Sequence, residues 1–356
     1  VYKRQAGGGV QAWGDWMRKW FPKFLMMKVF VVGSAISNYG DLLGFRDWSD
    51  TGGRWSEGRV LSVFDEVERK SKELGIKSLL VKELDADLSS RLQQILGERY
   101  LFADSLPATV LSIPLRQAGG YLAAIRSRYR TKIKKRRMIA QSRGLSWEIA
   151  PADQVDAGEV YALYLQVLQR AKSVFEKVNR GFFEQVAKVF PENAFYILGY
   201  SGEGEKKRLS SCELVLCDGA MRLVYSGFDY EVKRDSDLYF NVFYAAIEEA
   251  EKLGYGELYL GQTAYEVKAE LGAHEVPLRI AVRSQSMVMR LLLRLLSGVL
   301  FPPTKYPERD VFSVPPPRPK SGDPNRIDQP HVTGLTQIIK RDKGVRIQPV
   351  KSVGRE

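Results

Sequence analysis

The chain has very few of the residues that most often bind metal ions or form disulfide bonds. Its 356 residues include two cysteines, Cys212 and Cys217, and two histidines, His274 and His331. The cysteines lie five positions apart in one strand-like run, so we expect their side chains on opposite faces of that strand. This pattern does not fit a disulfide-stapled secreted scaffold, favours a reducing cytoplasm and predicts no metal site.

The sequence also lacks a long uninterrupted hydrophobic run. A membrane-spanning helix needs about 20 consecutive apolar residues, and the longest candidate, within 285–301, is interrupted by Arg290 and Arg294. That segment predicts an amphipathic helix which packs on the core or lies at the surface of an anionic membrane. An aromatic segment at 1–24 allows the same two interpretations. Because it does not begin with methionine, we expect its natural start to be missing.

Positive charge, in contrast, is in excess. The 54 Lys and Arg residues outnumber 42 Asp and Glu, which gives a net charge of +12 and a pI of about 9.5. The excess is concentrated at 126–137 and in a proline-rich tail, 302–356, which we expect to be disordered or to wrap the surface. This charge implies acidic partners: phosphorylated substrates, nucleic acid or anionic lipid.

The hydrophobic patterning predicts two α/β units in series. Strand-like runs lie at 30–34, 78–81, 108–113, 194–200, 209–217, 221–228 and 257–260, and helical periodicity at 60–74, 88–96, 121–140, 159–169, 181–189 and 238–253. We therefore expect a first subdomain at 25–117, a basic connecting helix at 118–143 and a second domain at 144–284. The similar order of elements in both units suggests a duplicated fold.

Three segments carry a resemblance to a known family. They are the basic helix YLAAIRSRYRTKIKKRR at 121–137, the aromatic-rich helix and strand at 238–260, and Gly261–Gly272, with its Tyr-x-x-Lys-x-x-Leu-Gly pattern. Together they resemble the GNAT-like acyltransferase domain of the Fem-type peptidoglycan aminoacyltransferases and their relatives, over roughly residues 25–285. The resemblance implies an α/β (α+β) fold of two tandem GNAT-like units, with mixed central sheets flanked by helices and linked by a long basic helix.

The loop before the helix at 238–253 bears on the acyl donor. CoA-dependent relatives have glycines there, which let the backbone approach a pyrophosphate at the helix N-terminus. This chain keeps Arg234 as a phosphate-binding candidate but has Asp237 and Tyr239 where glycines belong. A simpler interpretation is that Ser236 or Asp237 caps the helix. The loop therefore argues against acetyl-CoA as the acyl donor. The choice between an acyl-CoA and an aminoacyl-tRNA as donor stays open.

Lys268 is the leading catalytic candidate. In Fem-type enzymes a lysine in the comparable segment contacts the substrate, and such a group either holds a phosphate or stabilises an oxyanion. The alternative is a surface lysine paired with Glu266 or Glu270. Tyr265 and Tyr239 are candidates for orienting hydroxyl groups, and Gly261, at the end of its strand, is a candidate substrate-binding position.

The basic helix carries eight Lys or Arg residues among the twelve at 126–137, without an acidic residue to relieve their repulsion. Arg126, Arg130 and Lys134 are therefore predicted to contact phosphates of a nucleotide-linked substrate or of tRNA. The alternative is a solvated helix face.

Taken together, the sequence predicts a bacterial N-acyltransferase. It would transfer an acyl or aminoacyl group to an amine of a cell-envelope precursor or small metabolite. Because no Ser-His-Asp or Cys-His set is readable, direct aminolysis is favoured over a covalent acyl-enzyme. We expect a cytoplasmic protein, with peripheral contact at the inner face of the plasma membrane as an option. The alternative is a non-catalytic protein of the same fold that binds RNA or anionic lipid through the basic helix.

Overall fold

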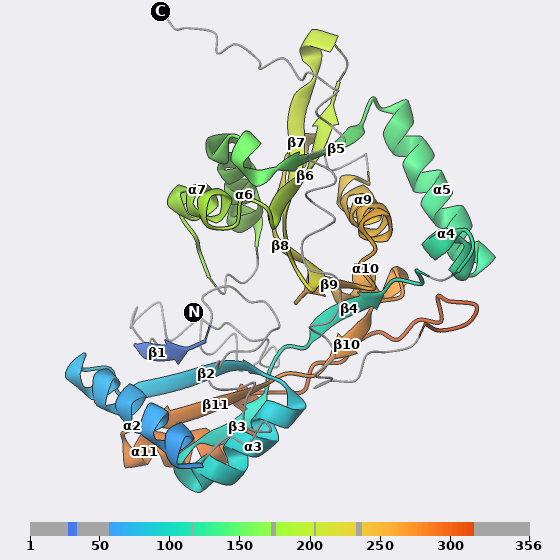
Figure 1. The fold of residues 1–356 in the computed structure, drawn as a ribbon. Helices are drawn as coiled ribbons and strands as arrows, with labels where there is room; N and C mark the ends of the chain where they lie inside the picture. The colour runs from blue at the N-terminus through green and yellow to red at the C-terminus, as the bar shows by residue number, and fades with distance from the viewer. Residues whose placement is uncertain are drawn as a thin grey trace, which may run out of the picture.

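The computed structural model describes residues 28–33, 57–115, 117–171, 176–202, 204–232 and 237–316. Within them the chain forms two lobes, each built on one mixed β-sheet with helices against it (Figure 1). The mixed α/β fold predicted from the sequence is confirmed.

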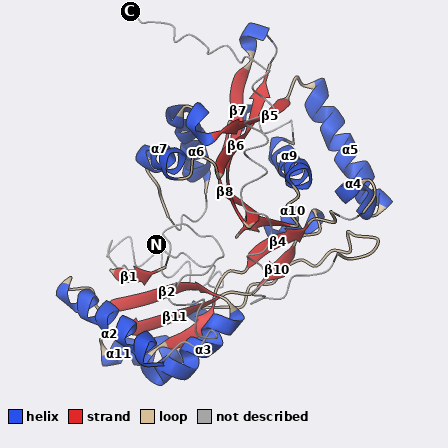
Figure 2. Ribbon diagram, in the orientation of Figure 1, coloured by secondary structure: helices blue, strands red, loops and turns tan. Residues whose placement is uncertain are grey.

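The small lobe is a four-stranded sheet with the order β1-β2-β11-β3. Strand β1 is parallel to β2, and β11 is antiparallel to both β2 and β3. Two helices, α2 and α3, lie against this sheet (Figure 2). Their apolar side chains pack on it around Phe64 and Leu92. The elements are β1 (Val29–Val32), α2 (Glu57–Glu73), β2 (Ser78–Leu84), α3 (Ala86–Leu96), β3 (Leu101–Asp104) and β11 (Arg279–Ser284).

The large lobe is a seven-stranded sheet with the order β10-β4-β9-β8-β7-β6-β5, in which only β8 and β9 are parallel neighbours. Helices α6 and α7 cover one face, and α9 covers the other, with α4 and α5 outside it (Figure 1). The strands are β4 (Ala108–Ser112), β5 (Ser146–Pro151), β6 (Ala194–Ser201), β7 (Arg208–Asp218), β8 (Ala220–Phe228), β9 (Glu257–Gly261) and β10 (His274–Val276). The helices are α4 (Gly120–Ala124), α5 (Ser127–Ser142), α6 (Ala157–Arg170), α7 (Arg180–Val189), α9 (Leu238–Leu253) and α10 (Tyr265–Glu270).

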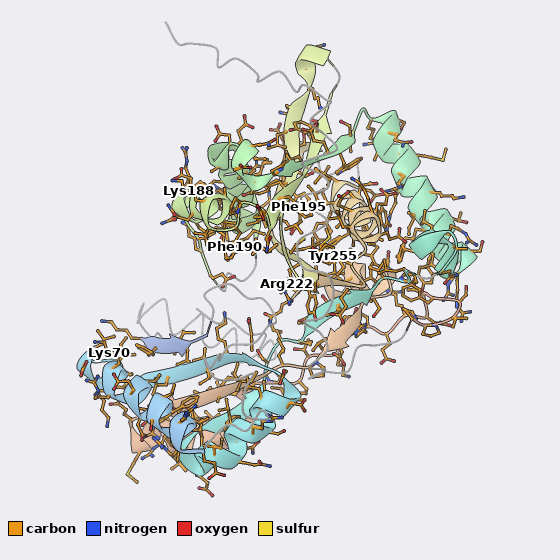
Figure 3. The ribbon with its side chains drawn as sticks, viewed as in Figure 1. Lys70, Lys188, Phe190, Phe195, Arg222 and Tyr255 are labelled. Carbon is orange, nitrogen blue, oxygen red and sulfur yellow. The ribbon has the colours of Figure 1, made fainter. Side chains whose placement is uncertain are left out.

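The core of the large lobe lies on both faces of its sheet. Phe195 and Ile197 of β6 are fully buried with Phe243 of α9 in one cluster, and Figure 3 shows Phe195 on the sheet. Cys217 belongs to this cluster, whereas Cys212 packs with α6 and α7 on the opposite face. Because the two clusters lie on opposite faces, the predicted placement of the cysteines is confirmed. Both cysteines are free and buried.

Two strands belong to a different sheet from the one that the predicted subdomain boundaries assign to them. Strand β4 belongs in sequence to the predicted first unit, but it pairs with β9 and β10 in the large sheet. Strand β11 comes at the end of the predicted second unit, but it fills the position between β2 and β3 in the small sheet. The chain therefore passes from the small to the large lobe between β3 and β4 and back between β10 and β11, and these connections tie the lobes together.

The predicted long basic helix is interrupted. Ile125 and Arg126 are extended between α4 and α5. The cause is a segment far away in sequence, because Ile125 forms an isolated antiparallel bridge with Phe312 and the Arg126 N–H donates to Val311 O at 2.8 Å. The single helix at 118–143 is thus corrected to two helices.

Residues 302–316 wrap the large lobe. Phe312 is 6% exposed and packs edge-on against Tyr121, with ring centroids 6.0 Å apart. It lies directly over Gly272, where φ is +84° and an added Cβ would come within 2.5 Å of the Phe312 ring. Disorder is therefore wrong for 302–316, and the wrapping interpretation describes them. The rest of the tail lies outside the described residues.

Candidate functional site

The site begins where two parallel strands separate. Strands β8 and β9 are paired at only two positions, Met221 with Leu258 and Arg222 with Tyr259. Beyond Arg222 the strands diverge, and the β8 edge that faces β9 is left without a β9 partner. Backbone N–H and C=O groups at such an edge need other hydrogen-bond partners, such as a ligand. A cavity of about 500 Å³ occupies this gap.

The cavity reaches both faces of the large sheet. Its walls come from α6, from the segment before α7, from β7, β8 and β9, from the start of α9, and from the turn leading into α10. The lining residues with polar or aromatic side chains are Tyr164, Glu176, Glu213, Tyr225, Ser226, Phe228, Tyr230, Tyr239, Phe243, Gln262, Thr263 and Lys268.

Lys268 is one of these lining residues, and its side chain is only 3% exposed. Its Nζ donates a hydrogen bond to Gln262 O at 2.8 Å. The turn before α10 places Thr263 and Ala264 at φ values of +64° and +50°. Left-handed backbone at a non-glycine residue costs about 1–3 kcal/mol and concentrates at functional sites. This turn brings α10 into the position where Lys268 faces the cavity.

Burial lowers the pKa of Lys268 to about 7, and the nearby Glu213 carboxylate opposes that shift. The surface-lysine interpretation is wrong, because the acids proposed as its partners bind other cations. Glu270 accepts from Lys132 at 2.7 Å, and Glu266 accepts from Arg309 at 2.7 Å. Lys268 is thus held inside the lobe with a depressed pKa, and such perturbed groups are more frequent at functional sites than elsewhere.

Glu213, which the sequence analysis missed, also lines the cavity. It lies on β7, is 2% exposed and accepts a hydrogen bond from Ser226 Oγ of β8. Burial raises its pKa to about 7, while the Ser226 hydrogen bond and Lys268 oppose the shift. A signal was present, because Glu213 is the single charged residue in the apolar strand run 209–217. A charge in such a run is rarely tolerated without a partner or a function.

The candidates Gly261, Tyr239 and Tyr265 divide into two groups. Gly261 and Tyr239 line the cavity, and Tyr239 packs edge-on against Phe243 with ring centroids 4.9 Å apart. Tyr265 is not among the lining residues. Its hydroxyl donates to Pro107 O at 3.0 Å and its ring packs against Tyr306, so it contacts the wrapping segment instead.

The phosphate-binding candidates of the basic helix lie apart from the cavity. Arg126 forms an ion pair with Asp310 and donates to Phe312 O, and Arg130 donates to Leu122 O at 3.1 Å. These two arginines hold the wrapping segment and the end of α4. Lys134 is exposed on α5. Arg234 lies outside the described residues.

Acids from distant elements neutralise much of the basic helix. Arg136 lies 3.2 Å from Glu270 and 3.7 Å from Asp237, and its guanidinium stacks on the Phe240 ring at 3.3 Å. Arg137 forms an ion pair with Glu248. The helix itself contains no compensating acid, and the compensating charges come from other elements, α9 and α10 among them.

Asp237 does not act as the predicted helix cap. It occupies the N-cap position of α9, but its side chain makes no capping hydrogen bond and its φ is +50°. Its carboxylate instead lies 3.7 Å from Arg136. Arg136 therefore compensates part of the negative charge of Asp237, which would otherwise repel the phosphates of a CoA donor.

The predicted amphipathic helix forms as α11 (Met287–Leu295) and α12 (Ser297–Leu300). Leu293 is buried, whereas Met287 and Leu295 are 77% and 71% exposed. Contact of the exposed apolar side chains of α11 with an anionic membrane stays a prediction. The aromatic segment 1–24 lies outside the described residues. Within the part of the chain that the structure describes, no helix is long and apolar enough to cross a membrane.

Several solved structures of other proteins are similar to this chain. The chain is similar, over 67% of its length and 77% of theirs, to the C-terminal domain of a putative lysylphosphatidylglycerol synthetase from Agrobacterium fabrum (12% identity, TM-score 0.46) and to L-PGS from Bacillus licheniformis (10%, 0.48). It is also similar to FemX, over 67% of this chain and 79% of that one (10%, 0.48). GCN5-related N-acetyltransferases match as well.

The solved structures that the chain is similar to therefore include FemX and GCN5-related N-acetyltransferases, which are proteins of the kinds named by the sequence resemblance. At 10–12% identity the likeness concerns fold and not activity. No protein-family model and no curated protein matches the chain.

Proposed function

We propose that the protein is an N-acyltransferase that transfers an acyl or aminoacyl group to an amine of a cell-envelope precursor or small metabolite. The observation that carries this proposal is the buried pair Lys268 and Glu213, which line one cavity where β8 and β9 diverge. An ammonium and a carboxyl group whose pKa values both lie near 7 are suited to proton transfer at neutral pH. Such perturbed groups concentrate in functional clefts.

The proposed reaction is a direct aminolysis. The ammonium of the acceptor gives a proton to the Glu213 carboxylate, and the neutral amine nitrogen then bonds to the acyl carbon. The carbonyl oxygen becomes an oxyanion, which the Lys268 ammonium stabilises. When the intermediate collapses, the bond from carbon to the sulfur or oxygen of the donor breaks. The second nitrogen proton passes by way of Lys268 to that leaving group, and Glu213 returns its proton to solvent.

Two donors remain within the proposal, acyl-CoA and aminoacyl-tRNA. The open edge of β8 suits either, because an extended arm with amide groups, or the backbone of an aminoacyl ester, would find main-chain donors and acceptors there. RNA or lipid binding by the basic helix alone is less well supported, since Lys132, Arg136 and Arg137 are paired with acids of the same chain.

A transfer assay tests the proposal. The purified protein is incubated with primary amines and with either acyl-CoAs or charged tRNA, and the amine is then analysed by mass spectrometry. We expect a mass gain of one acyl or aminoacyl group, with loss of an equal amount of donor. If neither class of donor is consumed faster with the protein than without it, the proposal is wrong. Comparing low with moderate salt separates specific tRNA use from nonspecific charge attraction.

A further inference from the structure

The cavity continues past Lys268 and Glu213 to the opposite face of the large sheet. Successive residues of β8 point to opposite faces, so Ser226 reaches Glu213 while Tyr225 reaches Glu176 on the α6 side. Both β8 residues line the same cavity. The cavity therefore has two ends, one at the proposed reaction centre and one beside α6.

The far end is built from a carboxylate and tyrosines. Tyr225 Oη donates to Glu176 Oε1 at 2.8 Å. The Tyr164 ring lies edge-on to Tyr225 with centroids 5.3 Å apart, and the Tyr164 hydroxyl accepts from Val178 N at 3.2 Å. These contacts hold the segment that carries Glu176 against α6. The carboxylate is thus placed among aromatic rings, which is an arrangement that attracts cations.

The charges around the cavity favour a cation as ligand. Two carboxylates, Glu176 and Glu213, line it together with a single lysine, Lys268. Lys82 lies 3.9 Å from Glu176 but also 3.7 Å from Glu83, so a further carboxylate balances it. One carboxylate thus lies at each end of the cavity, and each would repel an anionic group placed beside it.

An aromatic side chain of the same lining already carries a cation. The guanidinium of Arg170 lies over the Tyr230 ring at 4.3 Å. The remaining aromatic lining residues are Tyr164, Tyr225, Tyr239, Phe228 and Phe243. A linear ligand with an apolar middle could pack against these rings while each of its ends meets a carboxylate.

We infer that the acceptor carries two cationic nitrogen groups. One amine reacts beside Lys268 and Glu213, and the second cation binds Glu176 beside the rings of Tyr164 and Tyr225. The acceptor class is therefore a diamine or an amine that bears a second basic group. This inference rests on the proposed function, because it names the acceptor that the same cavity takes.

Three acceptors of equal chain length test the inference: 1,5-diaminopentane, pentylamine and 5-aminopentanoate. They differ only at the end away from the reacting amine, which is a cation, a methyl group or an anion. We expect kcat/KM to be at least roughly tenfold higher for the diamine than for pentylamine, which is the worth of one charge-assisted hydrogen bond. The anionic acceptor is expected to be the poorest of the three.

The variant Glu176→Gln keeps the shape of the side chain and removes its charge. We expect the ratio of diamine to pentylamine kcat/KM to fall toward one. Tyr225→Phe, which removes the hydroxyl that orients Glu176, should lower the same ratio by less. The matched control is Glu192→Gln, an exposed glutamate outside the cavity lining, and it should leave the ratio unchanged. Thermal melts confirm that each variant is folded.

Equal kcat/KM for the diamine and pentylamine, or a ratio that survives Glu176→Gln, would overturn the inference. A separate measurement covers the case in which no acceptor is acylated and the proposed function itself fails. Calorimetric titration of the protein with the three amines, without a donor, should then show diamine binding that Glu176→Gln weakens roughly tenfold. Equal binding of all three amines would overturn the inference there too.

Discussion

Replacing Lys268 with methionine is expected to lower kcat for transfer by about 10²–10³-fold, which is the usual cost of removing one oxyanion-stabilising donor. Methionine has a similar length and no charge, so it fills the same buried space. The melting temperature should change little, because two effects oppose each other: the variant loses a buried ammonium that is costly to desolvate, but it also loses the charge that faces Glu213. Steady-state kinetics and a thermal melt on the same preparation measure the two effects.

The matched control is Lys188→Met on α7. Lys188 is exposed and lies at the outer side of the large lobe, away from the β8–β9 gap (Figure 3). Its replacement should change neither kcat nor the melting temperature appreciably. Unchanged turnover in Lys268→Met would remove Lys268 from the mechanism. A loss of turnover together with loss of the cooperative melt would show that Lys268 is structural.

The second large effect concerns the wrapping segment 302–316. Phe312→Ala is expected to lower the free energy of unfolding by about 3–5 kcal/mol, as for other fully buried phenylalanines. The ring packs on Tyr121 and over Gly272, and its removal would leave a cavity at the junction of α4, α5 and α10. Denaturant unfolding at equilibrium measures this loss.

Val314 provides the comparison within the same segment, because its side chain is 77% exposed. Val314→Ala should change the free energy of unfolding by no more than about 0.5 kcal/mol. If the two variants lose similar stability, Phe312 is not the anchor and the segment does not hold the lobe as described.

Local patterns in the sequence predicted individual elements well. The helix predicted at 238–253 is α9, Leu238–Leu253, and it ends where Gly254 adopts a φ of +79°. Its apolar spacing and the glycine that stops it are both local signals. The placement of β11 in the small sheet could not be predicted in the same way. That strand completes a sheet whose other strands come from the start of the chain, and no local pattern encodes that pairing.

The residues of the candidate site differ in the same way: a local pattern predicts one of them, and only the fold brings the others to the cavity. Lys268 could be predicted because it belongs to a short motif, Tyr-x-x-Lys-x-x-Leu-Gly. Glu213 and Glu176 could not, because only the pairing of β7 with β8 and the packing of α6 bring them to the same cavity. Glu213 nevertheless left a trace as a lone charge in an apolar strand, whereas Glu176 left none.

The basic helix shows why charge runs mislead when they are read locally. Within 126–137 nothing balances the eight cations. In the fold, Glu248 of α9 and Glu270 of α10 reach Arg137 and Arg136 and convert part of the run into interhelical ion pairs. Spacing along one helix cannot reveal partners that arrive from other helices.

In the proposed reaction, Glu213 and Lys268 handle the protons of the acyl transfer. The pH dependence of kcat/KM in the wild type and in Glu213→Gln tests these two roles. Glu213 acts as a carboxylate, so activity should rise as pH increases through a pKa of about 7. Lys268 acts as an ammonium, so activity should fall as pH increases through its own pKa of about 7. The two groups interact, and the apparent pKa values therefore belong to the pair.

We predict a narrow bell-shaped profile centred near neutral pH in the wild type. In Glu213→Gln we predict a much lower rate without the limb that has a pKa near 7, because no carboxyl group is left to titrate there. The remaining activity should instead follow the fraction of neutral acceptor amine, whose pKa lies at about 10. A wild-type profile that stays flat from about pH 6 to about pH 8, or a limb with a pKa near 7 that persists in Glu213→Gln, would contradict the assignment of the pair.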